Sequence, residues 1–150
     1  MADKLLVPPH NLEAERSVLG ALLIDKEAIL KVSDFLHADD FYHDAYGIVY
    51  DAILSLYDSR TPVDIITLSA HLEDSGKLKI IGGASLLAEL ANEVPTSTHI
   101  FQYASIVKQK SVLRKLINAG DKIKSLGFKE EDDVENLIDQ AEKSLFGVSQ

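Results

Sequence analysis

Apolar residues recur along this chain every three or four positions, which is the spacing of one face of an α-helix. No stretch keeps the alternation of apolar and polar residues that is typical of a half-buried β-strand. Asn11, Asp25 and Asp64 stand where a short polar side chain can cap the first turn of a helix. Over the first two thirds the pattern predicts helices at about residues 12–23, 26–36, 44–57, 65–72 and 84–90.

The last third carries a longer pattern. A stripe of apolar residues predicts one helix from about 98 to 125, about 40 Å long at 1.5 Å per residue. Gly127 ends it, and a second helix begins at about Asp132. Because a short loop joins the two, an antiparallel pair is the default arrangement. The predicted fold class is therefore all-α, with a compact multi-helix head followed by a long antiparallel helical hairpin.

The predicted segments are a flexible N-terminal tail at 1–10, a helical head at 11–97 and the hairpin at 98–150. Two helices alone cannot cover each other's apolar stripes. The hairpin therefore either folds back on the head or packs against a second copy of the chain. The residues expected to pack, within one hairpin or between two, are Leu113, Leu116, Val134, Leu137, Ile138, Ala141 and Leu145.

The composition is ordinary for a folded soluble domain, with 46% hydrophobic and 26% charged residues. No apolar run approaches the roughly 20 residues of a membrane span, and no secretory signal opens the chain. A cytoplasmic location is expected.

Charge is distributed unevenly. The 150 residues include 24 acidic and 15 basic side chains, for a formal net charge of −9, which disfavours a surface built as a whole to bind nucleic acid. Residues 101–124 are the exception, with six bases and one acid, and they leave open the alternative of a single-stranded nucleic-acid-binding helical module. Their bases are spread around the helix with few aromatic residues among them, so we favour a solvated, charge-paired face.

Motifs that carry chemistry are few. The chain has no Cys, which excludes disulfides, thiolate zinc sites and thiol catalysis. It lacks the phosphate-binding loop and the dinucleotide-binding and metalloprotease motifs, so no catalytic residue is assigned. Residues 37–44 offer two His and three carboxylates to a metal ion, but we interpret them as a loop between helices. Glu13 and Glu15 are expected to stabilise the first turn of their helix through its dipole.

The run from Pro8 to Gly20, PPHNLEAERSVLG, strongly resembles the start of DnaB-type replicative DNA helicases. Two departures are interpreted as packing variation: Tyr46 stands where the family usually has His, and Leu86 where it often has Tyr. The resemblance continues, in order and at family spacing, through Asp40-Phe41-Tyr42, residues 48–53, Pro62-Val63-Asp64, Gly82-Gly83, Tyr103-Ala104, residues 113–117 and Ala141-Glu142.

The resemblance implies a role as well as a fold. In that family this region is the N-terminal domain, a helical head plus a helical hairpin. The hairpins pair to build dimers within a ring of six, a trimer of dimers. The domain carries a docking surface for primase and in some lineages touches helicase-loader proteins, while little direct nucleic-acid binding is expected of it.

The resemblance also implies what this chain lacks. A RecA-like motor domain that uses ATP and Mg would follow after residue 150. The parent protein would be an ATP-dependent DNA helicase, whereas this chain is expected to be a fragment with no cofactor and no ATPase activity. Matching the family's primase contacts position by position gives Glu13, Tyr103, Ile117 and Ile123. For Ile117 and Ile123, burial within the hairpin or between hairpins remains the alternative.

Overall fold

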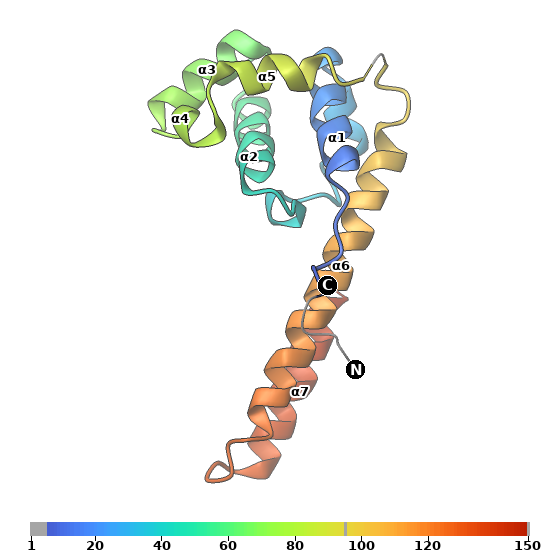
Figure 1. Cartoon of the computed structure of the whole chain (residues 1–150), viewed down its shortest axis with the longest axis vertical. Coiled ribbons are helices and arrows are strands. Elements are labelled where there is room, and N and C mark those ends of the chain that lie inside the picture. The colour runs from blue at the N-terminus through green and yellow to red at the C-terminus, as the bar shows by residue number, and fades with distance from the viewer. Residues whose placement is uncertain (1–5, 95, 150) are drawn as a thin grey trace. The chain divides into compact units, whose positions relative to one another are not determined.

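The computed structural model describes residues 6–94 and 96–149, and every regular element within them is a helix. The all-α prediction is therefore confirmed (Figure 1). No helix in this described part of the chain is long and apolar enough to cross a membrane. The elements are α1 (Leu12–Ile24), the 3₁₀-helices η1 (Ala28–Lys31) and η2 (Ala38–Asp40), α2 (Asp44–Asp58), α3 (Ile65–Asp74), α4 (Leu78–Ile81), α5 (Ala84–Ala91), α6 (Ile100–Leu126) and α7 (Val134–Val148).

The chain divides into two compact units. The head unit comprises residues 10–108, and the described part of the hairpin unit comprises residues 6–9 and 109–149. The division falls inside α6 because Ile100, Ala104 and Val107, in its first turns, are buried in the head core. Of the expected N-terminal tail, residues 1–5 lie outside the described residues.

Two helices of the head unit begin where the sequence places a capping side chain. Asn11 Oδ1 accepts the N–H of Ala14 at 2.9 Å, at the start of α1. Asp64 Oδ1 accepts the N–H of Thr67 at 2.8 Å, while the Asp64 N–H donates to Thr67 Oγ1 at 3.0 Å, a reciprocal pair that fixes the start of α3. These two predicted caps are confirmed, whereas Asp25, the third, does not begin an α-helix.

One predicted α-helix is wrong. After Asp25 the chain forms η1 and a series of tight turns, whose hydrogen bonds include Ala28 N–H to Asp25 O and Val32 N–H to Ile29 O, both at 3.2 Å. Bonds that span three residues also place residues i and i+3 on one side, so Ile29 and Val32 are buried as an α-helix would bury them. The apolar spacing in the sequence therefore did not distinguish a 3₁₀-helix from an α-helix. The four-residue α4 was too short for its spacing to predict.

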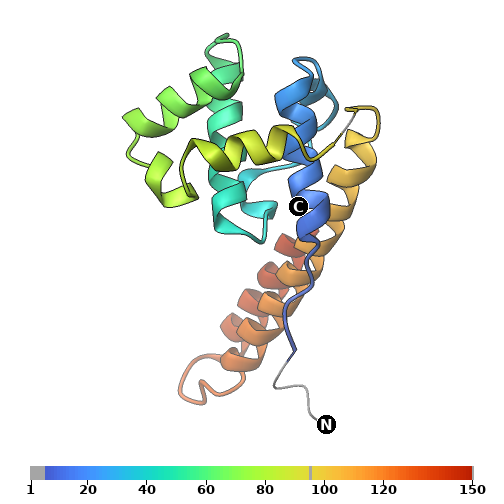
Figure 2. The same cartoon turned by 45° about the horizontal axis from the view of Figure 1, so that its top comes forward.

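The head core gathers fully buried side chains from successive helices, among them Leu19, Tyr50, Leu68 and Leu87. Helix α5 packs against α1 and α3 (Figure 2). The approach of α1 to α5 requires a glycine, because a Cβ at Gly20 would run into the carbonyl oxygen of Leu90.

In the hairpin unit, the part of α6 after residue 108 and α7 run side by side in opposite directions in both views (Figures 1 and 2). Asp133 caps α7 by accepting the N–H of Asn136 at 3.3 Å. Arg114 Nη1 donates to the carbonyl oxygen of Pro9 at 2.7 Å, so α6 also holds the segment that precedes α1.

Candidate partner-binding surfaces

Large apolar side chains on both helices of the hairpin unit are exposed to solvent. The exposed fraction is 43–49% for those on α6 and 56–68% for those on α7. On each helix their spacing, in steps of three, four or seven, places them along one side. We call this set the hairpin face, and its members are Leu113, Leu116, Ile117, Val134, Ile138 and Leu145.

The hairpin unit buries little apolar surface of its own. Helix α7 has no buried residue, and Leu137 and Ala141 are only half-buried. On α6 beyond residue 108, the buried apolar residues are Ala119 and Leu126, at 8% and 4% exposure. Because exposed apolar surface of this extent marks an interaction site on a soluble protein, the hairpin face is a candidate interface.

The four positions matched to primase contacts fall in both units. In the head unit, Glu13 is exposed in the first turn of α1, and Tyr103 is half-buried against the head core with its ring edge-on to His99. In the hairpin unit, Ile117 belongs to the hairpin face and is 47% exposed, while Ile123 is half-buried.

The polar residues at 37–44 do not act as one site, because their side chains bond to different partners. Asp40 is fully buried, where its Oδ2 atom accepts the N–H of His37 at 2.8 Å and pairs with Lys108 Nζ at 3.1 Å. His43 instead caps α2, since its Nδ1 atom accepts the N–H of Ala45 at 3.2 Å. Across residues 6–94 and 96–149, no three His, Cys, Asp or Glu side chains converge in a group that could hold a metal ion.

Tyr50 lies close to this buried carboxylate. Its hydroxyl donates to the carbonyl oxygen of Leu36 at 2.8 Å. Burial raises the pKa of Tyr50 above its ordinary value, and the negative charge of Asp40 raises that pKa further. Tyr50 is therefore a neutral hydrogen-bond donor that fixes the chain before η2.

Glu15 has a role that its sequence position did not reveal. Its side chain is 1% exposed and accepts the N–H groups of Tyr42 at 2.8 Å and of His43 at 3.2 Å. A carboxylate of α1 thus holds the segment that leads into α2. Spacing within α1 suggests only the dipole interaction, because the two donors lie 27 and 28 residues further along the chain.

Two bases of the 101–124 segment are engaged within the chain. Lys108 pairs with Asp40 in the head unit, and Arg114 donates to Pro9 in the hairpin unit. Their charges therefore serve the fold, which leaves fewer bases to form a strip for nucleic acid.

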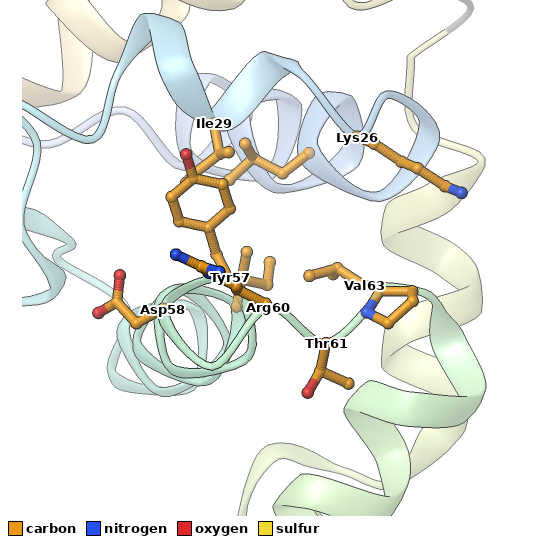
Figure 3. Close-up of a pocket in the computed structure, with 10 residues that line it drawn as sticks. Lys26, Ile29, Tyr57, Asp58, Arg60, Thr61 and Val63 are labelled. Carbon is orange, nitrogen blue, oxygen red and sulfur yellow. The ribbon is translucent and has the colours of Figure 1, made fainter.

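The head unit contains a pocket with a volume of about 490 Å³, between the end of α1, η1 and the connection from α2 to α3 (Figure 3). Its buried wall is apolar, and its exposed polar lining consists of two cations, one carboxylate and the Tyr57 hydroxyl, with the half-buried Thr61 beside them. We call it the head pocket, and it is lined by Leu22, Lys26, Ile29, Ile53, Tyr57, Asp58, Arg60, Thr61, Pro62 and Val63.

Arg60 ends α2 in a conformation that favours glycine. Its φ is 60°, and it is the one residue other than glycine with a positive φ in the described ranges. The N–H of Thr61 donates to Leu56 O at 2.9 Å and that of Arg60 to Tyr57 O at 3.0 Å, the bonds of a left-handed helix cap. No sequence signal marks this position, because glycine, the residue that usually indicates such a cap, is absent.

Comparison with known proteins shows the relationship of the chain. The family model described as "DnaB-like helicase N terminal domain" matches residues 7–109. The replicative DNA helicase DnaC of Bacillus subtilis is 42% identical over 144 residues, which cover 96% of this chain and 32% of that protein. The replicative DNA helicase DnaB of Mycobacterium leprae is 41% identical over 145 residues, covering 95% of this chain and 24% of that protein.

Two solved structures are also similar. The crystal structure of the N-terminal domain of DnaB helicase from Mycobacterium tuberculosis has a TM-score of 0.90 at 42% identity, covering 95% of this chain and 99% of that one. A DnaB-like replicative helicase, studied together with its interactions with primase, has a TM-score of 0.75 at 25% identity, covering 92% of this chain and 31% of that one. The chain spans about a third or less of the full-length helicases it matches. It belongs to the DnaB-like helicase N-terminal domain family.

Proposed function

We propose that this chain is the non-catalytic assembly and docking domain of a hexameric replicative DNA helicase. In this role it pairs with other subunits through the hairpin face and binds primase, and in some settings a helicase loader, during DNA replication. ATP and Mg would act in a separate motor domain of the same protein. The proposal rests on family membership and on the exposure of the hairpin face.

The hairpin face carries the self-association part of the proposal. Its six side chains are too apolar and too exposed to be explained by packing within the hairpin unit, where α7 buries no residue. A second hairpin offers the same apolar stripe, so two copies related by a two-fold axis can cover each other. Burial of these side chains supplies the affinity, because exposed charge pairs contribute little.

Sedimentation velocity tests this pairing. The chain is expected to sediment as a dimer or larger species at high micromolar concentration. Ile138→Asp, which places a charge on the hairpin face, is expected to weaken association by roughly tenfold or more, the equivalent of about 1.4 kcal/mol. Ile66→Asp is the matched control, because Ile66 is 79% exposed on α3, outside the hairpin face. A strictly monomeric chain at high micromolar concentration would contradict the pairing.

Primase docking is proposed from the similarity to a DnaB-like helicase studied with primase and from the matched positions. Tyr103 is the best single test, because aromatic side chains anchor many interfaces and this one is half-buried rather than fully buried. Calorimetric titration with the helicase-binding domain of the cognate primase is expected to show micromolar or tighter binding that Tyr103→Ala weakens. Unchanged affinity in a folded Tyr103→Ala chain would contradict the assignment of Tyr103.

The competing proposal is single-stranded nucleic-acid binding by residues 101–124. It requires fluorescence anisotropy to show binding of a single-stranded oligonucleotide that falls steeply with added salt. We expect no binding at low salt, since Lys108 and Arg114 are already engaged within the chain.

A further inference from the structure

The head pocket is an apolar cavity with a recessed floor. The floor residues Leu22, Ile29 and Ile53 are 3%, 3% and 1% exposed. Tyr57 and Val63 stand on opposite sides above it (Figure 3). The volume of about 490 Å³ lies within the range of roughly 300–1,000 Å³ that is usual for small-ligand sites. A molecule that fills this pocket must therefore present mainly apolar surface.

Hydrogen bonds fix two walls of the pocket in advance of any ligand. In the connection from α2 to α3, Thr67 Oγ1 donates to the carbonyl oxygen of Pro62 at 2.8 Å. After α1, Asp25 Oδ1 accepts the Glu27 N–H at 2.9 Å, which holds the turn that carries Lys26. Because a preformed pocket needs little ordering when a ligand enters, even a small molecule can bind it.

The charged residues of the lining are divided between two sides. Figure 3 shows Lys26 on one side of the pocket, and Arg60 with Asp58 on the other. Arg60 and Asp58 carry opposite charges, so their side is neutral in sum. Lys26 is the one charge on its own side, and it forms no ion pair within residues 6–94 and 96–149. The lining therefore offers a single cation to a ligand.

This positive charge stands in an acidic part of the chain. Residues 1–100 hold 16 acidic and 7 basic side chains. Two of those seven bases line the head pocket together with one carboxylate, which leaves the lining with one net positive charge. The pocket therefore favours an anion, whereas the charge of the surrounding chain disfavours one.

We propose that the head pocket binds a small monocarboxylic acid with an aromatic or branched apolar body. The carboxylate pairs with Lys26, and the body fills the space between Tyr57 and Val63. A second anionic group at the far end is disfavoured, because it would meet Asp58 as well as Arg60. The site lies in the head unit and uses no residue of the hairpin face, so it goes beyond the assembly and docking role and does not depend on it.

γ-Phenylbutyrate is the probe, and γ-phenylbutyramide, which has the same shape without the charge, is its matched control. Each is titrated into the isotope-labelled whole chain while NMR follows the amide chemical shifts. The acid is expected to saturate with a Kd in the high micromolar to low millimolar range and to shift amides of the lining, such as those of Thr61 and Val63. The amide is expected to bind several-fold more weakly, because it cannot form the ion pair. The proposal is overturned by no saturation at tens of millimolar acid, by equal affinities of acid and amide, or by shifts confined to the hairpin unit.

Replacement of Lys26 tests the ion pair. Lys26→Gln is expected to weaken binding of the acid roughly threefold to fivefold, the scale of an exposed ion pair, and to leave binding of the amide unchanged. Lys26→Arg keeps the charge and is expected to keep the affinity. Lys31→Gln, which removes an exposed head-unit cation outside the lining, is the matched control and is expected to bind the acid as the wild type does. Equal losses in Lys26→Gln and Lys31→Gln would assign the effect to overall charge and overturn the pairing.

Filling the cavity tests its location. Val63 is half-buried, and Val63→Phe is expected to weaken both acid and amide on the order of tenfold or more, because the new ring occupies the space of the ligand. Val63→Leu is the milder variant, expected to weaken both less. Ile66→Phe adds an aromatic ring on α3 outside the lining, where Ile66 is 79% exposed, and is expected to change neither affinity. Unchanged binding by Val63→Phe and Val63→Leu chains that circular dichroism shows to be folded would place the acid elsewhere and overturn the proposal.

Discussion

Lys108 Nζ lies 3.1 Å from the Oδ2 atom of Asp40, a carboxylate whose side chain has no exposed surface. The two residues are 68 positions apart, and their pairing fastens the early part of α6 to η2 within the head unit. The same oxygen accepts the N–H of His37, so the buried charge is met by a cation and a backbone donor. The first turns of α6 are thereby held to the head core.

Lys108→Ala is expected to lower the free energy of unfolding by about 2 kcal/mol, since it leaves Asp40 charged, buried and without its cation. The value lies below that of a fully buried pair because the Lys108 side chain is 25% exposed. Urea denaturation followed by circular dichroism measures it. Lys124→Ala, exposed near the end of α6, is the control and should stay within about 0.5 kcal/mol of wild type. If the two variants lose similar free energies of unfolding, the ion pair with Asp40 does not stabilise the fold.

The part of the fold that the sequence predicted depends on local interactions. Asn11 and Asp64 cap helices through donors three residues away, and a window of a few residues contains that information. The role of Glu15 and the ion pair of Asp40 could not be predicted in the same way, because the backbone donors to Glu15 and the cation of Asp40 lie 27 to 68 residues distant. A buried carboxylate and a solvated one in a first helical turn have the same local sequence pattern.

Of the two candidate surfaces, the hairpin face could be predicted from local sequence and the head pocket could not. The apolar spacing on α6 and α7 pointed to residues such as Leu116 and Ile138, because one helical face is a local property. The head pocket escaped prediction, since it joins the end of α1 to the end of α2 and depends on where the two helices meet. The left-handed end of α2 at Arg60 escaped prediction as well, because the sequence offers no glycine there.

Gly20→Ala is expected to lower the free energy of unfolding by about 1–3 kcal/mol, because the new Cβ would run into the carbonyl oxygen of Leu90 and push α1 away from α5. Thermal unfolding followed by circular dichroism measures the loss. Gly120→Ala is the matched control within α6, where a Cβ meets open space. That change should raise stability by about 0.5–1 kcal/mol through its helix propensity. A tolerated Gly20→Ala would contradict the close approach of α1 and α5.

Leu137 and Ile138 are neighbours on α7 with different expected roles. Leu137 is half-buried, so Leu137→Ala is expected to cost the single chain about 1–2 kcal/mol, less than a fully buried leucine. Ile138 is 56% exposed on the hairpin face, so Ile138→Ala should leave the single chain within about 0.5 kcal/mol of wild type and weaken self-association. Denaturation at low concentration and sedimentation at high concentration separate the two effects. Reversed outcomes would mean that α7 presents its other side to a partner.

Asp25 links the end of α1 to the loop before α6. The Ser97 hydroxyl donates to its Oδ2 atom at 2.7 Å, and the Glu27 N–H donates to its Oδ1 atom at 2.9 Å. These hydrogen bonds, the one from Ser97 foremost, hold the pKa of Asp25 below its ordinary value. A lowered carboxyl pKa contributes stability that is present above the ordinary pKa and lost as the pH falls through the folded-state value.

Ser97→Ala removes the hydrogen bond that contributes most to the lowered pKa of Asp25. The pKa of Asp25 is therefore expected to rise toward its ordinary value, and the acid-side loss of stability to become shallower. Carbon-detected NMR titration of the Asp25 carboxyl measures the pKa directly. Ser85→Ala is a suitable control, since its hydroxyl donates to the Gly82 carbonyl and contacts no carboxylate in the described part of the chain. An Asp25 pKa unchanged by Ser97→Ala would show that the Glu27 N–H alone sets it.

Arg60→Gly is expected to raise the free energy of unfolding by about 1 kcal/mol, because glycine adopts the left-handed conformation at the end of α2 without the clash of a Cβ. Arg60→Ala is the informative control: it removes the same charge but keeps the Cβ, so its stability should match that of the wild type. Denaturant titration of the three chains distinguishes backbone strain from charge. If glycine and alanine stabilise equally, the gain comes from relief of charge repulsion, and the strain assigned to Arg60 is absent. If glycine alone stabilises, relief of the backbone strain at Arg60 accounts for the gain.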